Sequence, residues 1–442
     1  PMPVGRTIAR ATELATRRIT ENARRTGQER RAFLAGLCGA ATTLLTLNQA
    51  FAAKGNTGGR FEVPAEAALD SGAAAQRLAG DEFIFDAQTH LVEPDAPWRD
   101  GPAAGWARTF TSWPQGACGE ADPVACYDAD HFVREVFLDS DTDMALLSFV
   151  PSPPGENPLS MAEAARAREL VAALDGAQRL LLHTIVIPNW PPLEAQLARM
   201  EETVAEYPIA AWKTYTGWGP GGVGWRLDDP ATGVPFLEKA RELGIRTVCI
   251  HKGLPFSGQD RAFARCDDVG PAAAMFPDIQ FVLYHSGYET GTREGPFADG
   301  GAARGVDTLI RSLTAHGIPP GANVYAELGS TWRILLRDPS GAAHLLGKLM
   351  RAVGTSRILW GTDSIWYGSP QDQIQAFRAF EIAAELTERY GYPELSQEVK
   401  ADILGRNAAA LFGIDAGAMR RRADGDGIGR VRREYAEAPE PS

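Results

Sequence analysis

FIFDAQTHL, residues 83–91, is an apolar run that reaches Asp86 and then presents two polar side chains, Gln88 and His90, two positions apart. A short run that is apolar on both faces is typical of a strand buried in a parallel sheet. Seven further runs of this kind follow. They are MALLSFV (144–150), LLLHTIVI (180–187), IAAWKTY (209–215), RTVCIH (246–251), IQFVLYH (279–285), NVYAEL (323–328) and RILWGTD (357–363).

Segments with helical periodicity separate these strands. They include residues 161–174, 193–207, 234–244, 342–354 and 370–390. The alternation predicts an α/β fold, a (β/α)8 barrel over residues 81–413, with an insertion after the first strand at roughly 91–140 and a C-terminal helix over 395–413. An open doubly wound sheet would need a glycine-rich turn that leads into a helix. The glycine-rich stretch 217–225 leads toward a loop, which we interpret as an active-site loop or a plain turn.

The chain of 442 residues is acidic, with a formal net charge of -12 and a pI near 5.2. Nucleic acids and anionic membranes require a concentrated positive field, so the composition argues against both as partners. We expect a small-molecule substrate, and the sequence leaves assembly into a homo-oligomer open. Cys118 and Cys126 lie in a loop-like stretch, where a disulfide could close a small loop.

The first sixty residues differ in composition from the rest. Arginines precede an uncharged apolar stretch over 32–52, and the junction ERRAFL (29–34) resembles a twin-arginine export signal. We therefore expect residues 1–60 to direct export to the periplasm, with no stable membrane partner afterwards. A membrane-spanning segment and an attached amphipathic helix are the alternatives. The tail 414–442 is mixed in charge, and we expect it to be solvated or wrapped on a neighbour.

Polar residues collect where the predicted strands end, and in a barrel these ends form one functional face. They are Asp86, Gln88, His90, Lys213, His251, His285 and Asp363. Neutral imidazoles and a carboxylate are good ligands for Zn²⁺, and an open fourth position would hold a water whose pKa is lowered. A further imidazole can act as general base. This division suits His251 as a ligand and His285 as the base.

Four stretches carry a family resemblance: ILWGTDSIW around Asp363, FVLYHSGYE around His285, VCIHKG around His251, and GRNAAALFG at 405–413. Together they resemble the amidohydrolase superfamily, in the branch with aminocarboxymuconate-semialdehyde decarboxylase, aromatic-acid decarboxylases and pyrone-dicarboxylate lactonase. The resemblance implies a (β/α)8 barrel, commonly one divalent metal, and hydrolysis of a C–O or C–N bond or non-oxidative decarboxylation.

The resemblance also implies roles for single residues. His90 and His251 correspond to metal ligands, His285 to the catalytic histidine, and Asp363 to the carboxylate of the eighth strand, which serves both as ligand and in catalysis. Lys213 falls where some members carry a carboxylated lysine. We interpret it as a contact for a substrate anion, with a structural ion pair as the alternative.

Gln88 departs from the family pattern, because it stands where the first histidine of a His-x-His pair belongs. An amide oxygen is a weaker donor than imidazole toward Zn²⁺. Three outcomes remain open: a metal held by His90, His251 and Asp363 with Gln88 as a weak fourth ligand, the same residues working without metal, or a barrel that only binds.

Aromatic residues near the strand ends, including Trp218, Tyr288 and Trp366, are candidates for substrate contacts, while His183 lies inside a strand and is expected to be a core residue. The predicted function is hydrolysis of a lactone, amide or ester of a small aromatic or carboxylated molecule by an activated water. Decarboxylation of an aromatic or unsaturated acid and a catalytically inactive ligand-binding barrel are the alternatives.

Overall fold

Eight parallel strands form the predicted barrel in a computed structural model that describes residues 5–175, 178–256, 258–300, 303–425 and 427–437. The strands pair in chain order from β2 to β9. They are β2 (Phe85–His90), β3 (Met144–Ser148), β4 (Leu180–Ile185), β5 (Ile209–Tyr215), β6 (Thr247–His251), β7 (Gln280–Tyr284), β8 (Val324–Glu327) and β9 (Ile358–Leu359). All eight predicted strands are present, so the prediction of a (β/α)8 barrel is confirmed.

The barrel closes between its first and last strands, where β9 is much shorter than predicted. The backbone N–H of Ala87 donates to Trp360 O (2.9 Å), that of Asp363 to Gln88 O (2.9 Å), and that of His90 to Ser364 O (2.6 Å). These bonds continue the sheet beyond the two residues of β9. We call this line of contact the seam.

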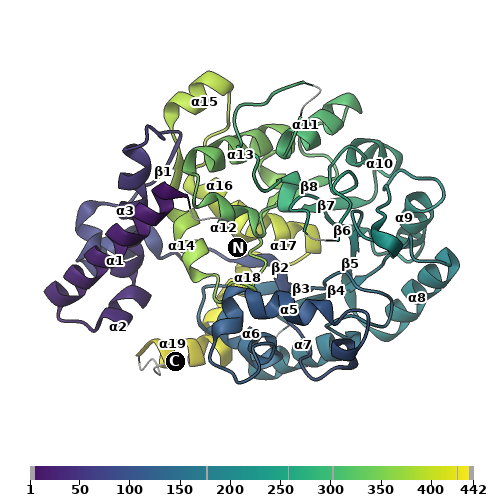
Figure 1. Ribbon diagram of the computed structural model, residues 1–442, viewed down its shortest axis with the longest axis horizontal. Coiled ribbons are helices and arrows are strands. Elements are labelled where there is room, and N and C mark those ends of the chain that lie inside the picture. Colours follow the sequence, from purple (N-terminus) through teal and green to yellow (C-terminus); the bar gives the residue numbers. More distant parts are fainter. Residues whose placement is uncertain (1–4, 176–177, 257, 301–302, 426, 438–442) are drawn as a thin grey trace.

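Helices surround the strands (Figure 1). They are α7 (Met161–Asp175), α8 (Leu193–Glu206), α9 (Gly233–Glu242), α10 (Val269–Met275), α11 (Val306–Ala315), α12 (Thr331–Leu335), α13 (Pro339–Ala352) and α14 (Gln371–Ala379). Apolar side chains such as Phe85, Leu146, Val282 and Leu359 fill the interior of the barrel. The predicted C-terminal helix consists of α16 (Gln397–Ala401), a π-helical turn (Asp402–Arg406) and α17 (Asn407–Phe412), which packs against β2 and β9.

The insertion after the first strand is present and is built from short helices. They include α5 (Gly105–Ser112), α6 (Ala129–Phe132) and a π-helical turn (Val133–Leu138). A disulfide joins Cys118 to Cys126 within the insertion. Trp106 of α5 packs against Phe256, in the segment that follows β6, with ring centres 5.7 Å apart. The insertion thus contributes to the face on which the strands end.

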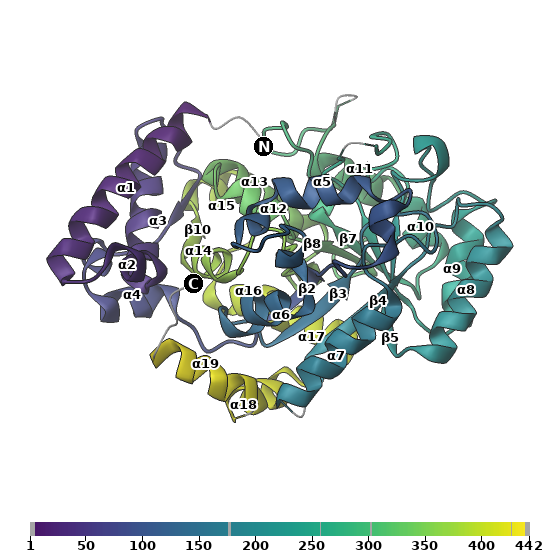
Figure 2. The ribbon, with the colours of Figure 1, turned by 60° about the horizontal axis from the view of Figure 1, so that its bottom comes forward.

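The N-terminal segment folds as a group of helices on one side of the barrel (Figures 1 and 2). They are α1 (Arg6–Thr26), α2 (Arg30–Ala35), α3 (Leu37–Ala52) and α4 (Ser71–Leu78). Ala41 and Leu44 of α3 belong to the main core, and α3 and α4 contact α14. Throughout the described residues, every helix is too short or too polar to cross a bilayer. Export and the continued attachment of this segment both stay predictions.

Two other segments differ from their predictions. Residues 370–390 do not form one helix, because β10 (Phe380–Ile382) pairs with β1 (Gly59–Phe61) and separates α14 from α15 (Ala384–Tyr390). The tail forms α18 (Ala416–Gly425) and α19 (Gly427–Glu437), and α19 packs on α7 of the same chain, below the barrel in Figure 2. Ile428 is buried, so this part of the tail is not merely solvated. Residues 438–442 lie outside the described residues.

Candidate active site

A cavity of about 620 Å³ lies at the carboxyl ends of the strands, and most of the predicted site residues line it. The predicted residues in its lining are Gln88, His90, Trp218, His251, His285, Asp363 and Trp366. This volume is within the usual range for small-molecule sites. The strand-end positions therefore do converge on one cavity, as the barrel fold predicts.

Asp363 follows β9 at the seam and accepts hydrogen bonds on both of its carboxylate oxygens. Oδ1 lies 2.8 Å from Gln88 Nε2 and 3.0 Å from His90 Nε2, and Oδ2 lies 2.5 Å from the Ser330 hydroxyl. Burial alone would raise the pKa of Asp363, but the bonds from His90 and Ser330 outweigh it and hold the pKa well below the usual range. The carboxylate is ionised throughout the working pH range of proteins.

The backbone of Asp363 also has an unusual conformation, with a φ of 63°. Residues with side chains seldom adopt this left-handed region, and those that do cluster at functional sites. Ser330, the donor to Asp363, is in the same region with a φ of 52°. The Ser330 hydroxyl also lies 2.7 Å from the hydroxyl of Tyr367. Both residues line the cavity; Tyr367 is one of the strand-end aromatic residues expected there from the sequence, and Ser330 was not singled out.

The hydrogen-bond partners of His90 and Gln88 determine which ring nitrogen of His90 is protonated and how the Gln88 amide is oriented. His90 must carry its proton on Nε2, since that atom faces the ionised Asp363. The Gln88 amide must point its NH₂ toward Asp363, because an amide oxygen 2.8 Å from a carboxylate oxygen would be repelled. This leaves Oε1 of Gln88 and Nδ1 of His90 buried without a partner among the described residues. Burial lowers the pKa of His90, which favours the neutral ring.

His285 and His251 form a chain of hydrogen bonds that ends in the cavity. Nδ1 of His285 lies 2.6 Å from Gly329 O, so this nitrogen carries the proton. Nε2 of His285 is then an acceptor, and His251 Nδ1, 3.1 Å away, donates to it. The remaining nitrogen, His251 Nε2, keeps its lone pair in this tautomer and lies 3.4 Å from Leu254 O. Burial lowers the pKa of His285 to about 4 and that of His251 well below its ordinary value, so both rings are neutral.

A divalent metal would need three of these donors around one point, and the structure does not gather them. His90 and Asp363 are close enough to share a cation. His251 is engaged with His285, and among the described residues the three predicted ligands do not bring their ligand atoms within 4.8 Å of one another. Gln88 turns its NH₂, a hydrogen-bond donor, toward the site. As placed, these side chains do not fit a three-ligand metal centre, and the ligand roles stay predictions.

Lys213 does not reach the cavity, contrary to its interpretation as a contact for a substrate anion. Side chains two residues apart on a strand share a face, and Tyr215 occupies the outer position above Lys213 on β5. The ammonium is fully buried, has no hydrogen-bond partner among the described residues, and lies 3.7 Å from the centre of the Tyr284 ring and 4.7 Å from that of Tyr215. Burial lowers the pKa of Lys213 to about 7.

Tyr288 is likewise absent from the cavity lining. Its ring is buried in the main core, and its backbone N–H donates to His285 O. Burial raises the pKa of its hydroxyl to about 12. Tyr288 therefore supports the loop after β7 and does not line the cavity. His183, expected as a core residue, is fully buried with Nε2 3.1 Å from the Tyr284 hydroxyl.

Aromatic side chains form the walls of the cavity. Trp366 stacks on His90 with ring centres 4.7 Å apart, and Tyr215 stacks on His251 at 4.8 Å. Trp106 and Trp113, which were not predicted from the sequence, come from the insertion, and Trp113 packs on Trp366 at 4.8 Å. The insertion has no strand-end position to mark its residues, so only the structure could place them here.

Two buried carboxyl groups, Asp86 and Glu327, lie beneath the site. Asp86 accepts hydrogen bonds from the backbone N–H of Gln88 and Thr362, and burial raises its pKa to about 7. Glu327 accepts from the backbone N–H groups of His285 and Gly329, and burial raises its pKa well above the ordinary value. Neither lines the cavity. Both fix the backbone that carries the site residues.

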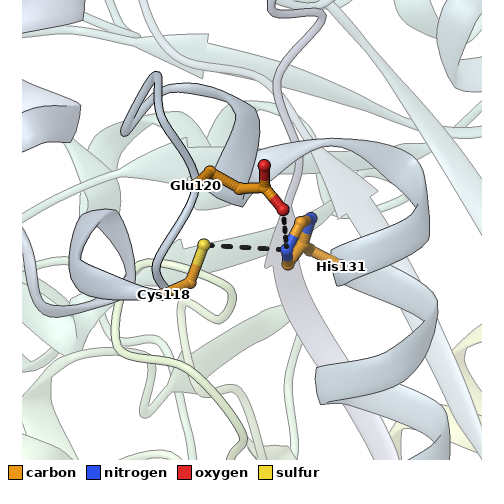
Figure 3. Close-up of side chains that lie close together, drawn as sticks. All are labelled: Cys118, Glu120 and His131. Atoms are coloured by element: carbon orange, nitrogen blue, oxygen red, sulfur yellow. Dashed lines mark hydrogen bonds and ion pairs between the residues drawn. The ribbon is translucent and has the colours of Figure 1, made fainter. Parts of the chain in front are cut away.

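A second group of possible metal ligands lies in the insertion, where Cys118, Glu120 and His131 point toward one another (Figure 3). His131 Nε2 is 3.6 Å from Cys118 Sγ and 3.7 Å from a Glu120 carboxylate oxygen. Cys118 is bonded to Cys126, however, and a disulfide sulfur is not the thiolate that binds metals. In the oxidised protein this group is therefore not a metal centre.

Solved structures similar to this chain have low sequence identity and modest superposition. They include 2,6-dihydroxybenzoate decarboxylase from Rhizobium (15% identity, 75% of this chain and 99% of that one, TM-score 0.43). A second is a putative 2-pyrone-4,6-dicarboxylic acid hydrolase from Pseudomonas putida (16%, 75% and 98%, 0.41). A third is an amidohydrolase from Burkholderia multivorans with bound zinc (16%, 75% and 99%, 0.44). No curated protein sequence matches this chain.

The match to a family model is more extensive. The amidohydrolase family model aligns with residues 85–414, from the first barrel strand to just beyond α17. This range includes every residue named above in the cavity lining. The chain belongs to the amidohydrolase family.

Proposed function

We propose that the protein is a hydrolase that cleaves a lactone, ester or amide of a small aromatic molecule with a water activated by His251. The observation that carries this proposal is the chain from Gly329 O through His285 to His251, which leaves the lone pair of His251 Nε2 at the cavity lining, with only a long contact of 3.4 Å to Leu254 O. A base that is oriented by a second group is a recurring arrangement in hydrolytic enzymes.

In this mechanism a water replaces Leu254 O, 3.4 Å from His251 Nε2, as the partner of that nitrogen. His251 Nε2 then takes a proton from the water as the water oxygen attacks the carbonyl carbon. The ionised Asp363 favours the protonated form of His251 electrostatically. When the tetrahedral intermediate collapses, the proton passes from His251 to the leaving oxygen or nitrogen.

This mechanism differs from the prediction in the identity of the base. His285 was expected to activate water directly, but its Nε2 faces His251 and its Nδ1 faces Gly329 O. We therefore assign His285 a positioning role. No step passes through a metal, since the donor set does not fit one as placed.

The proposal is tested by the release of acid from phenyl acetate and dihydrocoumarin, measured by pH-stat with and without a metal chelator. General-base catalysis contributes about 10²- to 10⁴-fold, so His251→Asn should lose at least about 100-fold in kcat/KM. His316→Asn, in an exposed residue at the end of α11, serves as the matched control. Loss of activity on chelation would contradict the metal-free mechanism, and full activity of His251→Asn would exclude His251 as the base.

The same experiment addresses the two alternatives. A decarboxylase would release carbon dioxide from 2,6-dihydroxybenzoate and leave the esters intact. A barrel that only binds would show no turnover, and Asp363→Asn would then change no measured rate. For a hydrolase, Asp363→Asn should lower kcat because the charge that stabilises protonated His251 is lost.

A further inference from the structure

The lining of the cavity carries a negative charge and no cationic side chain. Among its described residues there is neither Lys nor Arg, and its one formally charged group is the carboxylate of Asp363. A substrate anion would therefore enter a cavity whose resident charge has the same sign as its own.

Two cations that contact residues of the lining, Lys213 and Arg333, are engaged elsewhere. Lys213 lies beneath the floor, where its ammonium contacts the faces of Tyr284 and Tyr215. Arg333 lies over the ring of Tyr367, 4.7 Å from its centre, and pairs with Asp372 at 3.4 Å. Neither residue is part of the lining. A carboxylate in the cavity would thus exchange its hydration for aromatic walls without gaining an ion pair, which is unfavourable.

The walls suit a flat, uncharged ligand. Trp106, Trp113, Phe256 and Trp366 line the cavity, and Trp106 lies 5.7 Å from Phe256 between ring centres. Aromatic faces bind aromatic ligands through apolar burial and ring stacking. The uncharged polar groups of the lining, among them Thr109 and Ser152, can donate single hydrogen bonds to a carbonyl.

We propose that the cavity selects uncharged aromatic esters, lactones or amides and rejects aromatic carboxylates. This inference rests on the proposed function and narrows its substrate class. It also separates this chain from the decarboxylation alternative, because a decarboxylase must bind a carboxylate. Electrostatic repulsion from Asp363 and the loss of hydration should together weaken the binding of a carboxylate by at least about tenfold relative to a neutral ligand of equal size.

Binding can be measured without turnover by the quenching of tryptophan fluorescence. The matched probes are 2-acetylnaphthalene, a neutral ketone that cannot be hydrolysed, and 2-naphthoate, a carboxylate of nearly the same shape. The ketone is expected to have a Kd at least about tenfold lower than that of the naphthoate. Equal affinities, or tighter binding of the naphthoate, would overturn the inference.

A pair of variants on α5 tests whether the missing cation is the cause. Thr109 lines the cavity, while Thr111 lies on the same helix, is exposed and is outside the lining. Thr109→Arg should tighten the binding of naphthoate by about tenfold or more and Thr111→Arg should not. The ketone affinity of each variant reports an intact cavity. If Thr109→Arg binds the ketone normally without gaining affinity for naphthoate, the inference fails.

These experiments distinguish a failure of the inferred selectivity from a failure of the proposed hydrolase function. If the ketone binds preferentially and no ester or lactone is hydrolysed, the selectivity stands and the hydrolase proposal fails. If carboxylated esters are hydrolysed faster than neutral ones, the hydrolase proposal stands and the selectivity is wrong.

Discussion

Gln88 is the residue in which this site departs most clearly from a metal centre, because it places an amide NH₂ where a ligand of a cation would be expected. Its Nε2 lies 2.8 Å from Asp363 and 3.4 Å from His90. The amide thus supplies Asp363 with a hydrogen-bond donor. One hydrogen bond to a charged group contributes about 1.5–3 kcal/mol, so this contact is a substantial part of the stability of the ionised carboxylate.

Replacing Gln88 by His should convert this donor into a ligand. Gln88→His would put a second imidazole beside His90 and Asp363, and we expect the affinity for Zn²⁺ to rise at least about tenfold because imidazole is the better zinc ligand. Competition with a chromophoric chelator measures the affinity. Gln397→His, at the start of α16, is the surface control. An unchanged affinity would assign Gln88 to substrate recognition instead.

Lys213 is held in a position that destabilises the folded protein at neutral pH. Its pKa falls from its ordinary value to about 7 on folding, so the unfolded chain binds the proton more tightly. Each tenfold difference in proton affinity between the two states corresponds to about 1.4 kcal/mol. Below pH 7 the full cost is present, and it decreases as pH rises toward the pKa of the unfolded lysine.

Lys213→Met should therefore raise the free energy of unfolding by several kcal/mol at pH 7, and the gain should shrink by pH 10. Urea unfolding at the two pH values provides the measurement. Lys54→Met, at an exposed position just after α3, is expected to change stability little at either pH. A gain that is independent of pH would show that packing, rather than the titration of the amine, controls the effect.

The positions of single residues were predicted well where the direction of the strand determines them. They were predicted poorly where the direction of the side chain determines them. His90, His251, His285 and Asp363 follow strands, and every parallel strand of a barrel delivers its last residues to the same face. Lys213 was misplaced because the outermost inward position of β5 belongs to Tyr215. The limits of this strand, 209–215, were predicted correctly, so the error lay in assigning a residue two positions before the strand end to the cavity.

At the scale of elements, the insertion after β2 acts as a wall of the cavity, and its disulfide ties that wall together. Gln115, between Trp113 and Cys118, donates from its side chain to Cys126 O at 2.9 Å. The backbone N–H of Gln115 faces Trp366 O at 3.4 Å. The disulfide loop and the aromatic wall therefore share a set of contacts.

Removing the disulfide should weaken ligand binding and lower stability. A loop of this length contributes roughly 2.5 kcal/mol in the chain-entropy model, so the double change Cys118→Ser and Cys126→Ser should cost about that amount. We also expect a several-fold higher Kd for 2-acetylnaphthalene, because Trp113 loses its support. A thiol reductant should reproduce both effects in the natural chain and have no effect on the double variant. An unchanged Kd would show that the aromatic wall of the cavity does not depend on the disulfide.

Elements whose partners are close in sequence were predicted, and those with distant partners were not. The strands and the helices α7, α8 and α9 follow from local periodicity. The break in 370–390 does not, because β10 forms only by pairing with β1, more than 300 residues earlier in the chain. The disulfide also required two segments to meet, and its cysteines were close enough in sequence to suggest it.

At the scale of the whole molecule, the N-terminal helices and the barrel share one apolar core. Leu44 of α3 lies in the same buried cluster as Leu346 of α13 and Phe377 of α14. Such a continuous core makes unfolding cooperative. The composition of residues 1–60 indicated an export signal and did not indicate this packing. An apolar segment has the same composition whether it contacts a membrane or packs against a barrel.

Leu44→Ala tests this shared core. Truncation of a buried leucine costs about 2–5 kcal/mol, and we expect the loss to appear as a lower Tm of one transition for the whole chain. Leu34→Ala, in a side chain that is 50% exposed, should leave the Tm nearly unchanged. Differential scanning calorimetry measures both. A separate early transition in Leu44→Ala would show that the helices unfold independently of the barrel.

Because the site is completed across the seam, activity requires that the last strand of the barrel has been synthesised and has paired with the first. Asp363 is held by Gln88 and His90 across the closure between β2 and β9, so the two sides of the site are separated by 275 residues of chain. Until residue 363 has been synthesised, the nascent chain contains the side of the site formed by β2 but lacks the carboxylate of Asp363. Two fragments divided in a surface loop would each be inert, and activity on mixing them would report the closing of the barrel.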